Sequence, residues 1–167
     1  MEQYWRRTLP AIPPSDSVPE WNFASWVPDA VILSIGPNDF VGNDPNLRAF
    51  IDDYEELMED IVDAYTSITI SSGFPISPSE TIPKIIHVCG GSGNGFDPCE
   101  SIQTANEEFN QNRTDGFQGF YTSMNKEAWK LINFDKKFKG CSGHYNFKGH
   151  EILKEEIRTQ IAYIMGW

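Results

Sequence analysis

The feature that most constrains the fold of this chain is the apolar run A-V-I-L-S-I, which extends from Ala30 to Ile35 and ends abruptly at Gly36-Pro37. Successive side chains of a strand point to opposite faces, so a run that is apolar at consecutive positions predicts a strand covered on both faces. Strands of this kind are typical of parallel sheets. Such a strand belongs in the middle of a sheet, because at an edge its unpaired peptide groups would lie beside apolar side chains.

Further periodic segments follow this strand in an order that predicts an α/β domain. Residues 46–65 carry apolar side chains at spacings of three and four, with acidic residues on the opposite face, and predict a helix. The remaining predicted elements are a strand at 84–89, a helix at about 100–110, a short strand within 117–124 and a last helix at about 147–165 that buries Ile152, Leu153, Ile157, Ile161 and Ile164. This alternation is typical of a doubly wound parallel sheet.

Three stretches are expected to lack regular structure. Residues 1–29 are rich in proline and show no periodic pattern, so they predict an irregular lead-in to a folded part at 30–167. Residues 66–83 have the Ser/Thr/Pro composition of a long loop. Residues 125–143 are expected to be mostly irregular.

The charge of the chain excludes whole classes of partner. Its 24 acidic residues outnumber its 13 basic residues, which gives a net charge of −11. Binding to nucleic acid needs a basic surface that displaces counterions from phosphates, and an anionic membrane surface is disfavoured for the same reason. No apolar run approaches the roughly 18–20 residues of a membrane-spanning helix. Neutral substrates such as uncharged polysaccharides stay open.

The cysteines and one sequon bear on the compartment without deciding it. Cys89, Cys99 and Cys141 are compatible with one disulfide plus a buried thiol, or with three free thiols. The triplet Asn112-Arg113-Thr114 is a glycosylation acceptor compatible with secretion, although such triplets also arise by chance. The first residues have no apolar h-region, so they are not a signal peptide.

Candidate chemistry lies where the predicted strands end, since ligands of such sheets bind at the carboxyl ends of the strands. Gly36-Pro37-Asn38-Asp39 follows the first strand, and an asparagine there is able to aim its amide N–H at a developing oxyanion. The competing interpretation is a simple turn, because these four residue types are common turn formers.

Histidine supplies the second candidate. His144 precedes the last predicted helix, and a loop histidine at this edge of the sheet is suited to act as a general base near neutral pH, although single loop histidines are commonly just solvated. A metal site of His144, His150 and Cys141 has poor ligand spacing, so no metal is predicted. His87 falls inside a strand and is predicted to be a core or helix-facing residue.

Two segments together resemble a known family. The segment from Trp26, W-V-P-D-A-V-I-L-S-I-G-P-N-D-F, is similar to the third conserved block of the SGNH/GDSL hydrolases, and G-C-S-G-H-Y-N-F-K-G-H-E-I-L, from Gly140, resembles their last block. The stretches M-E-Q-Y-W-R-R-T-L-P and W-N-F-A-S-W-V-P-D resemble the acetylxylan esterases of the second carbohydrate-esterase family. The resemblance runs essentially from end to end of the chain.

The resemblance implies a three-layer α/β/α, flavodoxin-like fold, hydrolysis of acetyl esters on hemicellulose, an extracellular or secretory location, and no metal or organic cofactor. By position, Asn38 would donate to the oxyanion, and Gly36 would let the backbone approach the acyl group. Asp39 would hold the loop, and His144 would deprotonate the nucleophile and later protonate the leaving alcohol. The resemblance also implies a disulfide between Cys99 and Cys141.

The chain departs from the family at the nucleophile. No Gly-Asp-Ser block precedes Trp26, so the first strands of the sheet and the catalytic serine are expected to come from a missing N-terminal segment or a partner chain. Ser92 lies among glycines, but no helix is predicted directly after it, which favours a flexible loop. Ser142 and Cys141 stand where the family usually has the aspartate that orients the histidine. Some relatives use a serine–histidine dyad instead, in which a backbone carbonyl orients the imidazole. The alternative hypothesis is an inactive, structural or carbohydrate-associated relative.

Overall fold

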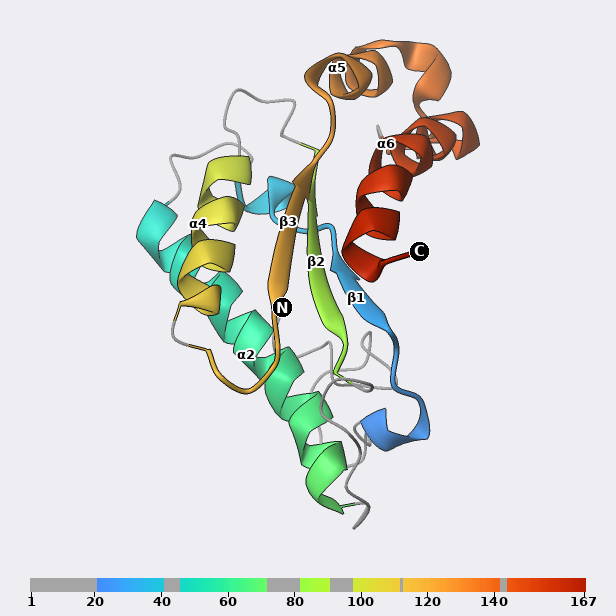
Figure 1. Cartoon of the computed structure of the whole chain (residues 1–167). Helices are drawn as coiled ribbons and strands as arrows, with labels where there is room; N and C mark the ends of the chain where they lie inside the picture. The colour runs from blue at the N-terminus through green and yellow to red at the C-terminus, as the bar shows by residue number, and fades with distance from the viewer. Residues whose placement is uncertain (1–20, 41–45, 72–81, 91–97, 112, 142–143) are drawn as a thin grey trace.

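The computed structural model describes residues 21–40, 46–71, 82–90, 98–111, 113–141 and 144–167 (Figure 1). Within these ranges, the chain forms a parallel sheet of three strands, β1 (Ala30–Leu33), β2 (Lys84–Cys89) and β3 (Gly119–Ser123), in the order β1-β2-β3. The predicted α/β class is therefore confirmed. None of the helices in these ranges has a stretch long and apolar enough to cross a lipid bilayer.

Two helices cover one face of the sheet. The helices α2 (Leu47–Ser71) and α4 (Cys99–Asn110) pack against each other, and α4 contacts both β2 and β3 (Figure 1). The buried residues of this main core are Ile51, Tyr54, Leu57, Met58, Ile61, Val62, Ile85, Cys89, Ile102, Ala105, Phe109 and Phe117. The 3-10 helix η1 (Phe23–Ser25) contacts α2, and the ring of Phe23 packs edge-on against Tyr65.

The opposite face is covered by α6 (Phe147–Met165), which contacts β3, so the molecule has helix, sheet and helix layers (Figure 1). A smaller core lies at the upper end of this layer in Figure 1, where α6 packs against α5 (Lys126–Phe134) and the 3-10 helix η3 (Lys136–Phe138). Its buried residues are Met124, Ile132 and Phe138, with Trp129, Tyr145, Ile152 and Leu153 packed against them.

Three expectations about these elements need correction. The apolar residues of α6, predicted to be buried, are only half-buried, because the main contacts of α6 among the described elements are with β3, α5 and η3. Residues 125–143 are not mostly irregular, because they contain α5 and η3. The helix α5 begins after Asn125, whose side chain caps it by accepting a hydrogen bond from Glu127 N–H. Helix α2 continues past residue 65 to Ser71, because the first helix-breaking residue is Gly73.

The outer edge of β1 is open in the described structure. The hydrogen bond from Lys84 N–H to the Asp29 carbonyl (3.1 Å) sets the ladder between β1 and β2, in which alternate residues of β1 direct their peptide groups to β2. The peptide groups of Ala30 and Ile32 therefore point away from β2, and the Ile32 side chain is 50% exposed. No described strand pairs with this side of β1, although the apolar run predicts a strand in the middle of a sheet.

The outer edge of β3 is closed by amide side chains. Asn110 of α4 bonds to both the N–H and the carbonyl of Gly119. Gln160 of α6 donates to the carbonyl of Ser123 at the other end of the strand, at 3.3 Å. Side chains that satisfy exposed peptide groups prevent a further strand from adding to an edge. The two edges of the sheet therefore differ, and in the described part of the chain the edge of β1 is the one left able to accept a strand.

Candidate active site

The carboxyl ends of all three strands meet at one small cavity. Its volume is about 110 Å³, and its lining comes from the end of β1, the end of β2, the residue after β3 and the segment that begins α6: Ser34, Ile35, Pro37, Val88, Cys89, Gly90, Met124, Tyr145 and Leu153. Most of these side chains are apolar. The cavity lies at the edge of the sheet where the sequence places the candidate chemistry.

The Gly36–Phe40 segment is held at its two ends and leaves its centre exposed. Gly36 has a positive φ of 111°, and a Cβ atom there would lie 3.2 Å from Cζ of Phe50 and 3.3 Å from Cδ1 of Ile102. At the other end, Phe40 is 1% exposed, and its ring stacks edge-on against Phe50 with centroids 4.9 Å apart. Between these anchors, the 3-10 helix η2 (Pro37–Phe40) presents Asn38 to solvent.

The turn interpretation of this segment is therefore also correct in part. Asp39 N–H donates to the Gly36 carbonyl at 2.9 Å, which closes a one-turn 3-10 structure. The Asp39 side chain is exposed rather than buried in the loop. A turn and an oxyanion donor are compatible, because the turn orients the peptide chain and the amide of Asn38 stays accessible.

His144 lies in a tight loop directly before α6, and its side chain is exposed. Its carbonyl accepts from Gly140 N–H at 2.7 Å, and its own N–H donates to the Cys141 carbonyl at 3.1 Å. Asn146 then fixes the start of α6, since its side chain accepts from Gly149 N–H at 3.2 Å and donates to the Lys139 carbonyl at 3.0 Å. The hydrogen bonds of His144 use its backbone, and its side chain stays exposed.

The structure brings the two candidate segments to the same end of the sheet. Pro37, the neighbour of Asn38, and Tyr145, the neighbour of His144, line the same cavity. His150 is on the first turn of α6, where its ring packs edge-on against Tyr145. Within the described parts of the chain, no three His, Cys, Asp or Glu side chains are grouped so as to hold a metal ion. Asn112 and Ser92 lie outside the described residues.

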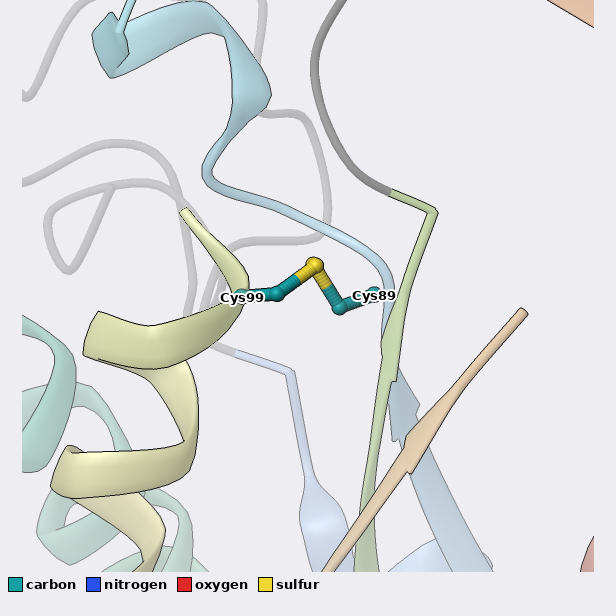
Figure 2. Close-up of a disulfide and its surroundings, with 2 residues drawn as sticks. All are labelled: Cys89 and Cys99. Atoms are coloured by element: carbon teal, nitrogen blue, oxygen red, sulfur yellow. A yellow bond between two sulfur atoms is a disulfide. The ribbon is translucent and has the colours of Figure 1, made fainter. Parts of the chain in front are cut away.

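The expected disulfide between Cys99 and Cys141 is wrong. Cys99 is bonded to Cys89, with Cα atoms 5.6 Å apart (Figure 2). Cys141 is a free, exposed thiol. The physical reason is the position of α4, whose first residue lies beside the last residue of β2. The bond therefore ties α4 to the carboxyl edge of the sheet, and it leaves the histidine loop without a covalent link.

A buried polar pair lies between α2 and β2. His87 is 0% exposed in the middle of β2, as its predicted place in the core implies, and its Nδ1 lies 3.1 Å from the hydroxyl of Tyr54 on α2. Burial lowers the pKa of His87 to about 4 and raises the pKa of Tyr54. Apolar periodicity placed Tyr54 on the inner face of its helix, but no local pattern identified its polar partner.

One of three comparisons with known proteins found a similar fold. No protein-family model matches the chain, and no curated protein matches it. A solved structure of a family two carbohydrate esterase from Cellvibrio japonicus superimposes with a TM-score of 0.70 over 99% of this chain, at 20% sequence identity. This chain spans 41% of the length of that protein. At this identity the likeness shows the fold, and the predicted three-layer α/β/α fold is confirmed.

Proposed function

We propose that this chain is the C-terminal part of a carbohydrate ester hydrolase that removes acetyl groups from xylan-type polysaccharides by a serine–histidine mechanism. The observation that carries the proposal is that Pro37 and Tyr145, the neighbours of Asn38 and His144, line one cavity at the carboxyl edge of the sheet. The fold shared with a family two carbohydrate esterase supports the substrate class. The net charge of −11 is compatible with an uncharged polysaccharide.

Each residue has a defined role in this proposal. His144 accepts the proton of the serine hydroxyl as the serine oxygen attacks the acetyl carbonyl. The Asn38 amide donates to the oxyanion that forms, and Gly36 allows close approach of the backbone. His144 then gives its proton to the leaving sugar oxygen. A water molecule repeats the attack on the acetyl-enzyme, which releases acetate and restores the serine. Asp39 supports the loop that carries Asn38.

The nucleophilic serine comes, in this proposal, from polypeptide outside these 167 residues. The open edge of β1 supports this view, since its outward peptide groups and the half-exposed Ile32 match what an added parallel strand would cover. The closed edge of β3 leaves β1 as the side for such a strand. A nucleophile at the end of the added strand would face the cavity, because parallel strands present their carboxyl ends at the same edge of the sheet.

A second candidate function is a catalytically inactive relative, structural or carbohydrate-associated. Two observations favour it: the sequence lacks a Gly-Asp-Ser block, and Cys141 and Ser142 replace the acid that would orient His144. Loss of the orienting acid costs orders of magnitude in rate in serine hydrolases. The extracellular or secretory location belongs to both candidates and is likewise a proposal.

Hydrolysis of an aryl acetate separates these functions. The 167-residue chain is assayed alone and after extension with encoded polypeptide that carries Gly-Asp-Ser after an apolar strand. The proposal expects background rates for the chain alone and turnover in the extended form, which His144→Ala abolishes and His150→Ala leaves intact. An extended form that is folded but inactive would support the inactive relative. Turnover by the chain alone that depends on His144 would place the nucleophile within this sequence.

A further inference from the structure

The buried His87 has one satisfied and one unsatisfied nitrogen. Its Nδ1 lies 3.1 Å from the Tyr54 hydroxyl, whereas its Nε2 is buried and has no hydrogen-bond partner among the described residues. On α4, Oδ1 of Asn106, a residue 7% exposed, is likewise buried and unpartnered within that part of the chain. Both atoms border the space beside Gly119. A Cβ atom on Gly119 would lie 3.4 Å from Nε2 of His87 and 2.2 Å from Oδ1 of Asn106.

The two unpartnered atoms are complementary in one protonation state. If the Tyr54 hydroxyl donates to Nδ1, then a neutral imidazole carries its hydrogen on Nε2. That N–H faces the region of the Asn106 oxygen, which is an acceptor. The opposite tautomer would leave an acceptor facing an acceptor, which buried groups disfavour. Neutral His87 with its hydrogen on Nε2 is therefore the state that suits both neighbours.

Packing connects this pair to the candidate oxyanion segment. The Tyr54 ring lies 5.6 Å from the ring of Phe50, centroid to centroid, and Phe50 in turn stacks on Phe40 and touches the space beside Gly36. A second cavity of about 110 Å³ lies between these groups, lined by Ile35, Gly36, Asp39, Phe50, Asp53, Tyr54 and Leu57. Movement of Tyr54 would therefore disturb the surface on which the Gly36–Phe40 segment rests.

We propose that Tyr54 and His87 are positioning residues for the Gly36–Asp39 segment, and that this positioning weakens when His87 becomes protonated in acid. The inference rests on the proposed function only for the role of that segment as oxyanion donor. The contacts themselves do not depend on the reaction. Neither residue belongs to the proposed reacting groups, so both act through Phe50.

The surroundings of His87 explain why protonation would be disruptive. The groups that face it are Tyr54 from α2, Asn106 from α4, and its register partners Tyr121 on β3 and Leu33 on β1. None of these four side chains is charged near neutral pH. An imidazolium in this position would be buried without a carboxylate among these neighbours, which is costly unless water enters or a neighbour moves. Burial is the cause of its low pKa, about 4.

Nuclear magnetic resonance of the full chain tests the proposal without any enzymatic assay. In protein labelled with ¹⁵N, we expect a single His87 tautomer at neutral pH with the hydrogen on Nε2. On acidification, His87 should titrate well below the ordinary histidine pKa of about 6.5. The backbone amides of Gly36 and Asp39 should move with the same midpoint.

Tyr54→Phe removes the hydroxyl and keeps the ring. We expect this variant to populate both His87 tautomers and to change the midpoint that the Gly36 and Asp39 amides report. Tyr65→Phe is the matched control, because Tyr65 is a half-buried tyrosine on the same helix, three turns beyond Tyr54, and its ring packs against Phe23. It should reproduce the wild-type tautomer and midpoint.

Several results would overturn the inference. These are an Nδ1–H tautomer in the wild-type chain, Gly36 and Asp39 amides that stay still while His87 titrates, and equal effects of the two tyrosine variants. Global unfolding in acid without a preceding movement of these amides would count against it as well. Because no hydrolysis is measured, an inactive extended protein with intact coupling would remove the proposed function and leave this relationship standing.

Discussion

Asn110 and Gly119 are joined by two hydrogen bonds: Gly119 N–H donates to Oδ1 of Asn110 at 2.9 Å, and Nδ2 of Asn110 donates to the Gly119 carbonyl at 2.9 Å. The side-chain amide thus takes the place that the peptide group of a further strand would occupy. It closes the edge of β3 at the residue where the strand begins, while the edge of β1 keeps outward peptide groups.

We expect Asn110→Leu to lower the free energy of unfolding by about 1–3 kcal/mol, because it leaves two partly buried peptide groups without their partner. Urea denaturation followed by circular dichroism measures the change. Gln103→Ala on the same helix is the control and should stay within about 0.5 kcal/mol of wild type, since Gln103 is exposed. Equal losses in the two variants would show that the edge contact contributes nothing.

The disulfide between Cys89 and Cys99 joins residues separated by 10 positions. Reduction should lower the free energy of unfolding by about 2–4 kcal/mol, because the unfolded chain loses a cross-link that restricts it. Urea denaturation with and without reductant measures this difference. Cys141→Ser should change neither curve, since Cys141 is free and exposed. A non-reduced peptide map that links Cys99 to Cys141 would contradict the pairing.

Stability should fall as the pH is lowered from about 6.5 to about 4. The pKa of His87 is lowered to about 4 in the folded protein, whereas an ordinary histidine has a pKa of about 6.5, so the unfolded chain binds more protons across this interval. The contribution of neutral His87 to the free energy of unfolding is fully present above about pH 6.5 and is lost as the pH falls to about 4. The difference between these two pKa values corresponds to roughly 3 kcal/mol of folding free energy.

Urea midpoints measured at successive pH values test this expectation against His87→Leu. The variant should show a shallower decline over the same interval. Other groups contribute with their own signs: burial raises the pKa of Glu55, which opposes the decline, and the hydrogen bond from Arg113 lowers the pKa of Asp115 despite its partial burial. These contributions are shared by both proteins, so the difference between the two curves reports His87. Parallel curves would exclude a neutral, buried imidazole.

In the extended, serine-bearing form, Asn38→Ala should reduce kcat about 10²–10³-fold, the loss found when one oxyanion donor is removed. The KM for an aryl acetate should change little, because the amide acts on the charge that develops during the reaction. Kinetic constants with the aryl acetate provide the measurement, with His150→Ala as a control. A change in KM alone would assign Asn38 to substrate binding.

Much of the fold followed from local patterns. The bounds of α4 and α6, and the places of β2 and β3, agree with the periodicity of apolar residues to within a few positions. The helix α5 was missed because it is 9 residues long and follows a strand with little separation. Its start depends on the cap of Asn125, which a pattern of apolar residues does not reveal.

The candidate site was predictable only in outline. The sequence placed Asn38 and His144 after a strand and before a helix, and the rule that carboxyl ends of parallel strands share one edge brought them together. The predicted partner of Cys99, Cys141, was wrong because disulfide pairing depends on which thiol lies within bonding distance. That is a property of how α4 docks on β2, and nothing in the spacing of three cysteines specifies it.

By itself, then, the sequence determined the α/β class and the places of most strands and helices, because those properties depend on neighbours a few positions away. The tertiary structure decided the Cys89–Cys99 bond, the half-exposure of Ile32 and α6, and the contact of Tyr54 with His87 across 33 positions. Contacts over such separations are set by the packing of whole elements, which local periodicity does not encode.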